Sequence, residues 1–299
     1  MNLDVQKIKN GLVSIVIVTR NRKALLQQCL ASCLSQTYKE LEVIVIDNAS
    51  TDDTVEMMQQ KFPQVKRISM HTNLGFFPVL NIAIANSFGE YIMTVDDDAY
   101  FTTENDIEAL VTCFKQDAAL GAATCNLIGP KETPITKGDR YIRVFTTGFT
   151  MVSRKVFSEW VGFYPDVFFR SAGETYVCSR LWDMGKTVKR FQNIVMYHEL
   201  ALQGRSDRDW KFYGLRSQLL CVIMREPGLY LLPSLFSKLF KSFFQFIKWK
   251  HTTTWFRVFF SFIGNLRTAV KLRRPVSVKT WKKFKQLDRQ YITDLQQIN

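Results

Sequence analysis

The sequence predicts an α/β fold, a mostly parallel sheet flanked by helices, and three observations lead to this class. Five short runs rich in β-branched residues predict strands: VSIVIV (13–18), EVIVID (42–47), VKRISM (65–70), YIMTV (91–95) and GAATCNLI (121–128). Segments with helical periodicity separate these runs. The runs are also nearly continuous in apolar residues, which is typical of parallel strands that are buried on both faces.

Amphipathic helices are predicted between the strands. Their sequences are RKALLQQCLASCL (22–34), TDDTVEMMQQKF (51–62), FPVLNIAIANSF (77–88) and ENDIEALVTCFKQ (104–116). Strands and helices that alternate in this way form a doubly wound sheet, in which ligands bind beyond the carboxyl ends of the strands. We therefore expect the polar residues that follow three of the strands to gather on one edge: Thr19, Arg20, Asn21, Arg22, Asp47, Asn48, Asp96, Asp97 and Asp98.

The following segment, from 141 to about 200, mixes strands with a helix. YIRVFTTGFTMVS (141–153) predicts a strand, and GETYVCSRLWDMG (173–185) predicts a short helix that Gly185 closes. KTVKRFQ (186–192) and IVMYH (194–198) predict two further strands.

The last part of the chain is basic and amphipathic. Of the formal net charge of +13, the segment from Arg225 onward carries +12, from 15 Lys and Arg against three acidic residues. In 231–250 and again in 255–271, aromatic and aliphatic side chains fall on one helical face and basic ones on the other. This pattern is typical of a helix lying in a membrane interface. A helix packed on the domain, with its basic face in solvent, is the alternative.

Composition argues against several other classes of protein. The apolar run near the N-terminus is too short for a signal peptide, and charged residues interrupt the longest candidates for a transmembrane helix. The six cysteines form no CxxC pair, so neither a zinc site nor a disulfide framework is predicted. The tail's aromatics lie opposite its lysines, which favours lipid over nucleic acid as its partner. We expect a cytoplasmic protein, peripheral on the inner face of the cell membrane.

Three adjacent carboxylates, Asp96 to Asp98, follow the predicted strand YIMTV. They repel one another, and burial without a compensating charge would be costly. A hard divalent cation, Mn²⁺ or Mg²⁺, held by few carboxylates and by phosphate oxygens would supply that charge. With a nucleoside diphosphate sugar as ligand, the cation would neutralise charge on the departing diphosphate. A solvated loop with an Asp helix cap is the alternative.

The order and spacing of these motifs resemble the inverting glycosyltransferases of family 2, which have the GT-A (Rossmann-like) fold. The resemblance covers about residues 12–200 and includes SIVIVTRNR (14–22), EVIVIDNASTDDT (42–54) and TNLGFFPVLNIAIANSFGEYIMTVDDDA (72–99). It implies that a set of strand-end and turn residues binds the nucleotide sugar: Thr19, Arg20, Asn21, Arg22, Asp47, Asn73, Asn81, Asp96 and Asp97. It also implies a metal held by Asp98, Asp96 and His198.

Glu174 stands where the family places its general base. An acceptor hydroxyl has too high a pKa to attack unaided at pH 7, so a carboxylate must take its proton. The alternative for Glu174 is an acid stabilised by the helix dipole, and for His198 a packed or exposed residue. Arg205 and Arg208 either contact phosphate or only pair with neighbouring aspartates.

Departures from the family pattern bear on the donor. Arg20 replaces a more usual Tyr, Tyr176 replaces a second acid, and Val79-Leu80-Asn81 replaces Ala-Arg-Asn. Asn81 after Asn-x-Gly-Phe is closer to the rhamnosyl- and galactofuranosyl-transferring branch. The resemblance therefore favours a UDP- or dTDP-linked donor.

The sequence thus predicts an inverting, metal-dependent glycosyltransferase that extends a lipid-linked or cell-surface glycan. We expect a GT-A domain at 1–225, with a nucleotide-binding half at about 12–128 and an acceptor half at about 129–225. A basic helical tail at 226–299 would follow. Two alternatives stay open: transfer to a polyprenyl phosphate, and a non-catalytic scaffold that binds a nucleotide sugar.

Overall fold

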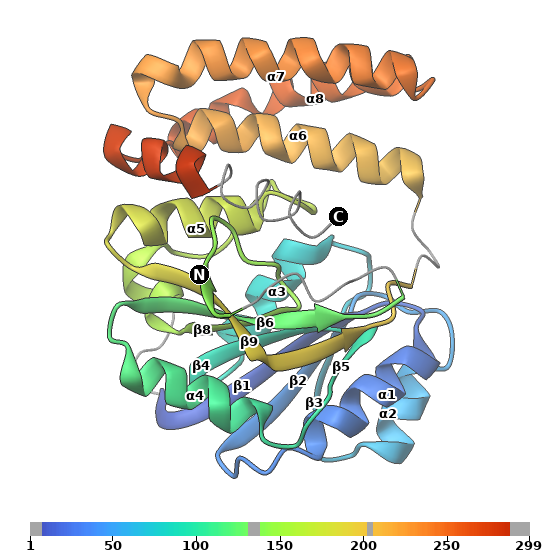
Figure 1. Ribbon diagram of the computed structural model, residues 1–299. Coiled ribbons are helices and arrows are strands. Elements are labelled where there is room, and N and C mark those ends of the chain that lie inside the picture. The colour runs from blue at the N-terminus through green and yellow to red at the C-terminus, as the bar shows by residue number, and fades with distance from the viewer. Residues whose placement is uncertain (1–7, 131–137, 202–205, 288–299) are drawn as a thin grey trace.

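The computed structural model describes residues 8–130, 138–201 and 206–287. Within them the chain forms one nine-stranded sheet with helices on both faces and a layer of long helices beyond one face (Figure 1). The strands are β1 (Lys9–Thr19), β2 (Leu41–Asp47), β3 (Lys66–Ser69), β4 (Gly89–Asp96), β5 (Ala99–Phe101), β6 (Leu120–Ile128), β7 (Arg140–Tyr141), β8 (Phe149–Ser153) and β9 (Thr187–His198). The helices are α1 (Lys23–Leu34), α2 (Thr54–Lys61), α3 (Phe76–Ala85), α4 (Asp106–Gln116), a π-helical turn (Val156–Trp160), α5 (Gly173–Asp183), α6 (Asp207–Arg225), α7 (Gly228–Lys248) and α8 (Thr252–Lys271). Residues 278–287 are also helical.

Burial on both faces explains the apolar runs of the central strands. Alternate residues of a strand point to opposite faces of its sheet. In β1, Ile15 and Ile17 join one buried cluster with residues of α1, α2 and α4, whereas Val16 joins a second cluster with residues of α3, α5 and α6. The predicted α/β class, with a central sheet between helices, is therefore confirmed.

The strand order places the expected ligand-binding position at the carboxyl ends of central strands. Within the described residues the order is β3-β2-β1-β4-β8-β6-β9-β5, and β7 pairs with β9. β1 and β4 are parallel neighbours, with Val18 opposite Asp96 at their carboxyl ends. Because the chain adds β2 and β3 on one side of β1 and β4 on the other, these two carboxyl ends form the topological switch point.

The second half of the sheet differs from the sequence prediction. The predicted strand 141–153 is wrong, because Arg140–Tyr141 and Phe149–Ser153 belong to separate strands and Gly148 takes a φ of +97° at the turn before β8. The predicted strands 186–192 and 194–198 are one strand, β9. β8 runs antiparallel to both β4 and β6, so the sheet is mixed: its first four strands are parallel to one another, and so are β6 and β9.

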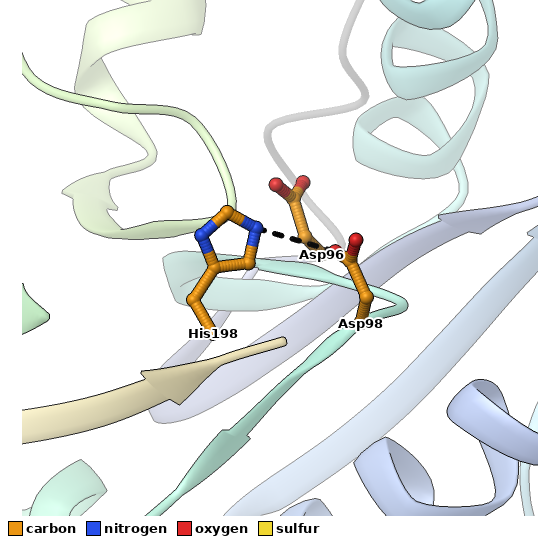
Figure 2. Close-up of side chains that lie close together, drawn as sticks. All are labelled: Asp96, Asp98 and His198. Carbon is orange, nitrogen blue, oxygen red and sulfur yellow. Dashed lines mark ion pairs between the residues drawn. The ribbon is translucent and has the colours of Figure 1, made fainter. Parts of the chain in front are cut away.

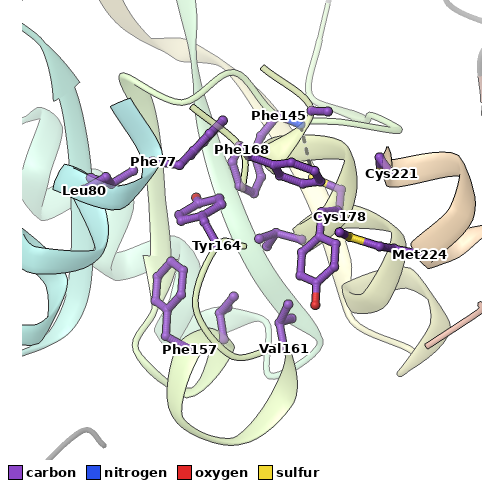
Figure 3. Packing of buried hydrophobic residues seen from close by; sticks show 14 of the residues in the cluster. Phe77, Leu80, Phe145, Phe157, Val161, Tyr164, Phe168, Cys178, Cys221 and Met224 are labelled. Atoms are coloured by element: carbon purple, nitrogen blue, oxygen red, sulfur yellow. Dashed lines mark hydrogen bonds between the residues drawn. The ribbon is translucent and has the colours of Figure 1, made fainter. Parts of the chain in front are cut away.

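The helical tail packs on the domain along one face. Cys221 and Met224 of α6 reach the cluster around Cys178 of α5 (Figure 3). Phe246 of α7 and Phe262 of α8 belong to the same buried cluster. The core therefore continues across the expected boundary at 225, and the packing alternative accounts for one side of these helices.

The other side of α7 and α8 is an outer apolar face. It consists of large apolar side chains that are 45% to 73% exposed: Leu229, Leu232, Phe236, Phe240, Phe244, Ile247, Phe256, Phe260 and Ile263. Soluble monomers rarely leave so many neighbouring apolar side chains in water. None of the described helices combines the length and the hydrophobicity that crossing a bilayer would need.

Candidate active site

A cavity of about 830 Å³ opens at the carboxyl ends of β1 and β4. The acidic triplet, His198 and Glu174 all line it, together with the turn after β1. We call it the rim cavity. Strands β1 and β4 bring the turn and the triplet together because they are parallel and in register at their ends.

Asp96, Asp98 and His198 form a cluster that could hold a metal ion. One ligand atom from each lies within 4.8 Å of the others (Figure 2). His198 Nε2 is 3.5 Å from Asp98 Oδ1. Asp96 ends β4, and His198 ends β9 and pairs with Ala99 of β5, so two strands fix the cluster. Carboxylate ligands suit Mg²⁺ or Mn²⁺, and the additional imidazole ligand favours Mn²⁺.

Gly148 leaves the space that the Asp96 carboxylate occupies. A Cβ added at Gly148 would fall 2.3 Å from Asp96 Cγ, where no real contact can exist. The φ of +97° would also strain any other residue at this turn. Gly148 therefore leaves space for the Asp96 carboxylate, and the side chains present fit a cation site.

Arg22 supplies the charge that allows two of the carboxylates to be buried. It donates to Asp97 Oδ1 at 2.8 Å, to Asp98 Oδ2 at 2.9 Å and to the Ala201 carbonyl at 2.9 Å. Burial raises the pKa of Asp97, and the attraction of Arg22 opposes that rise. Asp98 thus presents one oxygen to Arg22 and the other to His198. Arg22 and Asp97, both expected to bind nucleotide, line the cavity but mainly brace the cluster.

The turn after β1 carries three further predicted residues, and all of them line the rim cavity. Thr19 is buried and donates to Asp97 Oδ2 at 2.8 Å. Asn21, at φ +54°, accepts from the Thr51 amide at 2.7 Å, and Arg20 Nε donates to the Ala49 carbonyl at 3.4 Å. The loop after β2 therefore holds this turn in place.

Asn73 lines the cavity, whereas Asp47 and Asn81 do not. Asn73 Oδ1 accepts from the Gly75 amide at 3.0 Å. Asp47, 2% exposed, accepts from the Ser50 amide at 3.2 Å. Asn81, 3% exposed, donates to the Tyr164 carbonyl at 2.8 Å and accepts from the Tyr164 amide at 3.1 Å. The side chains of Asp47 and Asn81 hold turns, and a contact of either residue with nucleotide stays a prediction.

Two arginines that the sequence reasoning passed over line the rim cavity, Arg170 and Arg190. Arg190 is buried within β9, and a charged residue inside a predicted strand was the available signal. Arg208, by contrast, is exposed in the first turn of α6 and does not line the cavity. Arg205 lies outside the described residues.

Glu174 lies in the first turn of α5 and faces the same cavity as the metal cluster. Thr147 Oγ1 donates to Glu174 Oε1 at 3.1 Å. Burial raises the pKa of Glu174 above its ordinary value, and the hydrogen bond from Thr147 reduces that rise. A carboxyl group with a raised pKa is a stronger base once ionised, which suits proton abstraction from a hydroxyl.

The loop before Glu174 is strained and is held by α6. Ser171 and Ala172 both have positive φ, +63° and +66°, which is unusual for residues other than glycine. Ser217 Oγ donates to the Arg170 carbonyl at 2.8 Å, and Arg216 donates to the Val167 carbonyl at 2.8 Å. Helix α6 therefore holds the loop that leads to the predicted base.

Comparison with known proteins shows the family of this chain. The model of the family "Glycosyl transferase family 2" matches residues 14–173. An Escherichia coli UDP-Glc:alpha-D-GlcNAc-diphosphoundecaprenol beta-1,3-glucosyltransferase, WfaP, is 37% identical over 94 residues, which are 31% of this chain and 37% of that protein. The matched stretch covers 38% or less of the length of the curated relatives compared.

Two solved structures share the fold. S. aureus TarS 1-349 in complex with UDP-GlcNAc gives a TM-score of 0.64 at 14% identity, over 88% of this chain and 84% of that one. The mannosyltransferase PcManGT from Pyrobaculum calidifontis, in complex with GDP-Man and Mn²⁺, gives 0.59 at 16% identity, over 96% and 86%. With the family model matching more than half of its residues, this chain belongs to glycosyltransferase family 2.

Proposed function

We propose that the protein is an inverting, metal-dependent glycosyltransferase that uses a UDP- or dTDP-linked sugar. One observation carries this proposal: the Asp96–Asp98–His198 cluster and Glu174 line the same cavity. Transfer of a sugar from a diphosphate is assisted by a cation that offsets the charge on the leaving diphosphate and by a base that takes the proton of the acceptor hydroxyl. TarS with UDP-GlcNAc and PcManGT with GDP-Man and Mn²⁺ share the fold and support a nucleotide-sugar donor.

Asp96, Asp98 and His198 would hold Mn²⁺ or Mg²⁺, which when bound offsets the charge of the leaving diphosphate. Glu174 takes the proton of the acceptor hydroxyl while the hydroxyl oxygen bonds to the anomeric carbon and the bond from that carbon to the diphosphate oxygen breaks. Attack from the face opposite the diphosphate inverts the configuration. Thr147 holds the Glu174 carboxylate through its hydrogen bond, and Arg22 holds Asp98 with one oxygen directed at His198.

We propose a lipid-linked or cell-surface glycan as the acceptor. The name of WfaP describes a diphosphoundecaprenol-linked acceptor, and a polyprenyl phosphate is the second candidate. The outer apolar face supports work at a membrane surface, since basic residues such as Lys248, Arg257 and Arg267 accompany it in α7 and α8. Apolar side chains flanked by cations bind an anionic lipid surface such as the cytoplasmic leaflet.

Turnover of the full chain tests the proposal. The protein is mixed with Mn²⁺ and a panel of nucleotide sugars, and release of nucleoside diphosphate is measured with and without EDTA. We expect release from a UDP- or dTDP-linked sugar that EDTA abolishes and Asp98→Asn lowers by about 100-fold or more. Asp139→Asn, at an exposed aspartate, is the control. Binding of nucleotide sugar without any turnover would favour the scaffold alternative.

Cosedimentation tests the membrane partner. Vesicles that contain phosphatidylglycerol should bind the wild-type chain, and the double variant Phe236→Ser/Phe240→Ser should stay in solution. Binding to an oligonucleotide but not to vesicles would contradict the lipid assignment.

A further inference from the structure

A second cavity, of about 680 Å³, lies between α6, α7 and the helical residues 278–287. We call it the tail cavity. It adjoins the rim cavity, because Ser171 and Trp210 line both. Ser171 belongs to the strained loop and lies three residues before Glu174. A molecule seated in the tail cavity can therefore extend toward the predicted base.

The lining of the tail cavity is strongly cationic. Among the described residues it includes four lysines, Lys211, Lys238, Lys241 and Lys285, against one acidic residue, Glu226. Lys211 already pairs with Asp207 outside the cavity. Lys238 is half-buried and donates to Gln218 Oε1 at 2.9 Å, a neutral partner. The remaining positive charge makes the cavity suitable for an anion.

A smaller cavity behind it, of about 340 Å³, adds to this charge. It shares Lys238 and Lys285 with the tail cavity and also contains Arg143 and Arg225. Arg225 lies over the Tyr176 ring, 3.7 Å from its centroid, and donates to the Arg274 carbonyl. Two cavities thus place cationic groups on both sides of Lys238. Phosphate groups bind such clusters through charge-assisted hydrogen bonds.

Aromatic rings complete the tail cavity. Trp210, Trp249, Trp281 and Tyr230 all line it. Tyr230 and Trp281 stack on each other with centroids 3.9 Å apart, which makes a rigid aromatic wall. Trp210 is half exposed and stands where the two cavities meet. Flat apolar ring faces pack against the C–H faces of pyranose rings.

We propose that the tail cavity binds the acceptor and that this acceptor is a saccharide carrying a phosphate or diphosphate group. Lys238 and Lys241 bind the phosphate, Trp210 packs on the sugar, and the reacting hydroxyl lies beside Glu174. This inference rests on the proposed function and names its acceptor class. It also explains why α6 and α7 are part of the core: they form the acceptor site.

Calorimetry with the full chain tests the inference. The probes are the octyl diphosphate ester of N-acetylglucosamine, the neutral octyl glycoside of the same sugar, and inorganic pyrophosphate. We expect the diphosphate ester to bind most tightly. Lys238→Gln/Lys241→Gln should weaken its binding by about tenfold or more, because two charge-assisted hydrogen bonds are lost. The glycoside's affinity should change little.

Matched controls separate site effects from folding and from donor binding. Lys248→Gln alters an exposed lysine of the same helix that lines neither cavity, so it should bind the ester normally. Binding of UDP with Mn²⁺ should be unchanged in all variants. If the double variant fails to fold, Lys241→Gln alone, at an exposed position, replaces it.

Three outcomes would overturn the inference: no binding of the ester, an equal loss in Lys248→Gln, or pyrophosphate binding as tightly as the ester. Failure of the proposed function looks different. In that case UDP with Mn²⁺ would not bind the rim cavity and no donor would turn over, whether or not the diphosphate ester binds.

Discussion

The rim cavity buries charged side chains, whereas the outer apolar face exposes large apolar ones to solvent. Both regions depart from the usual distribution of residues. In the rim cavity a charged group is fully enclosed: Asp98 is 0% exposed and accepts from Arg22 and from the Ala201 amide. On α7, Phe236 and Phe240 are 71% and 55% exposed. Buried charge and exposed aromatic surface both cost free energy in an isolated protein. We propose that a cation and a diphosphate complete the first region and that an apolar surface completes the second.

The largest expected effect concerns the base in the rim cavity. Glu174→Gln keeps the shape of the side chain and removes its basicity, so transfer should fall by about 10²- to 10⁴-fold. Nucleotide binding should persist. Steady-state transfer and calorimetry with UDP measure the two properties. Glu159→Gln, at an exposed glutamate, is the control, and near-normal transfer by Glu174→Gln would exclude this residue as the base.

The two sides of α7 should respond differently to the same truncation. Phe246 is 3% exposed within the core cluster, so Phe246→Ala should lower the free energy of unfolding by about 3–5 kcal/mol. Phe240→Ala, on the outer face, should change it by less than about 0.5 kcal/mol. Urea unfolding measures both. Equal losses would mean that the outer face is covered by the protein's own chain.

A glycine pair tests how the rim cavity holds Asp96. Gly148→Ala and Gly162→Ala both place a side chain at positive φ, +97° and +85°, and each should cost about 1–3 kcal/mol of stability. At Gly162 nothing lies within 4 Å of the added Cβ, whereas at Gly148 it meets Asp96. Mn²⁺ affinity should therefore drop in Gly148→Ala alone. The same drop in both variants would show a general effect of backbone strain.

The smallest expected effect is a shift in pH dependence. The Thr147 hydrogen bond lowers the pKa of Glu174, so Thr147→Val should raise it further. Because the base acts when ionised, the acidic limb of the rate profile should move to higher pH. Thr146→Val, at the exposed neighbour, should leave the limb in place. A shift toward lower pH in Thr147→Val would contradict this role.

The sequence predicted the rim better than the tail, for physical reasons. Thr19 and Asp96 end β1 and β4, and Asp98 comes two residues after Asp96, so parallel register is enough to bring them together. Asp47 and Asn81 were placed by the family pattern, but their hydrogen bonds to Ser50 and Tyr164 depend on turns that no periodicity reveals. Arg190 enters the cavity only because β9 returns beside β6, a pairing of distant segments.

For α7 the sequence left two interpretations open, a membrane-interface helix and a helix packed on the domain. Amphipathicity alone cannot distinguish a face that packs on α6 from one left in solvent, and both faces carry phenylalanine, as Phe246 and Phe240 illustrate. Since the core continues into α8, removing residues from 226 onward would expose buried side chains of α6 as well as remove the outer apolar face. Point substitutions are therefore the better probes of membrane binding.

A crystal structure of the protein with Mn²⁺ and UDP tests the central claim most directly. The account predicts an anomalous manganese peak at Asp96, Asp98 and His198, with the diphosphate of UDP beside it and Arg22 still in contact with Asp97. UDP bound elsewhere, or manganese absent from the three side chains while nucleotide fills the rim cavity, would contradict it.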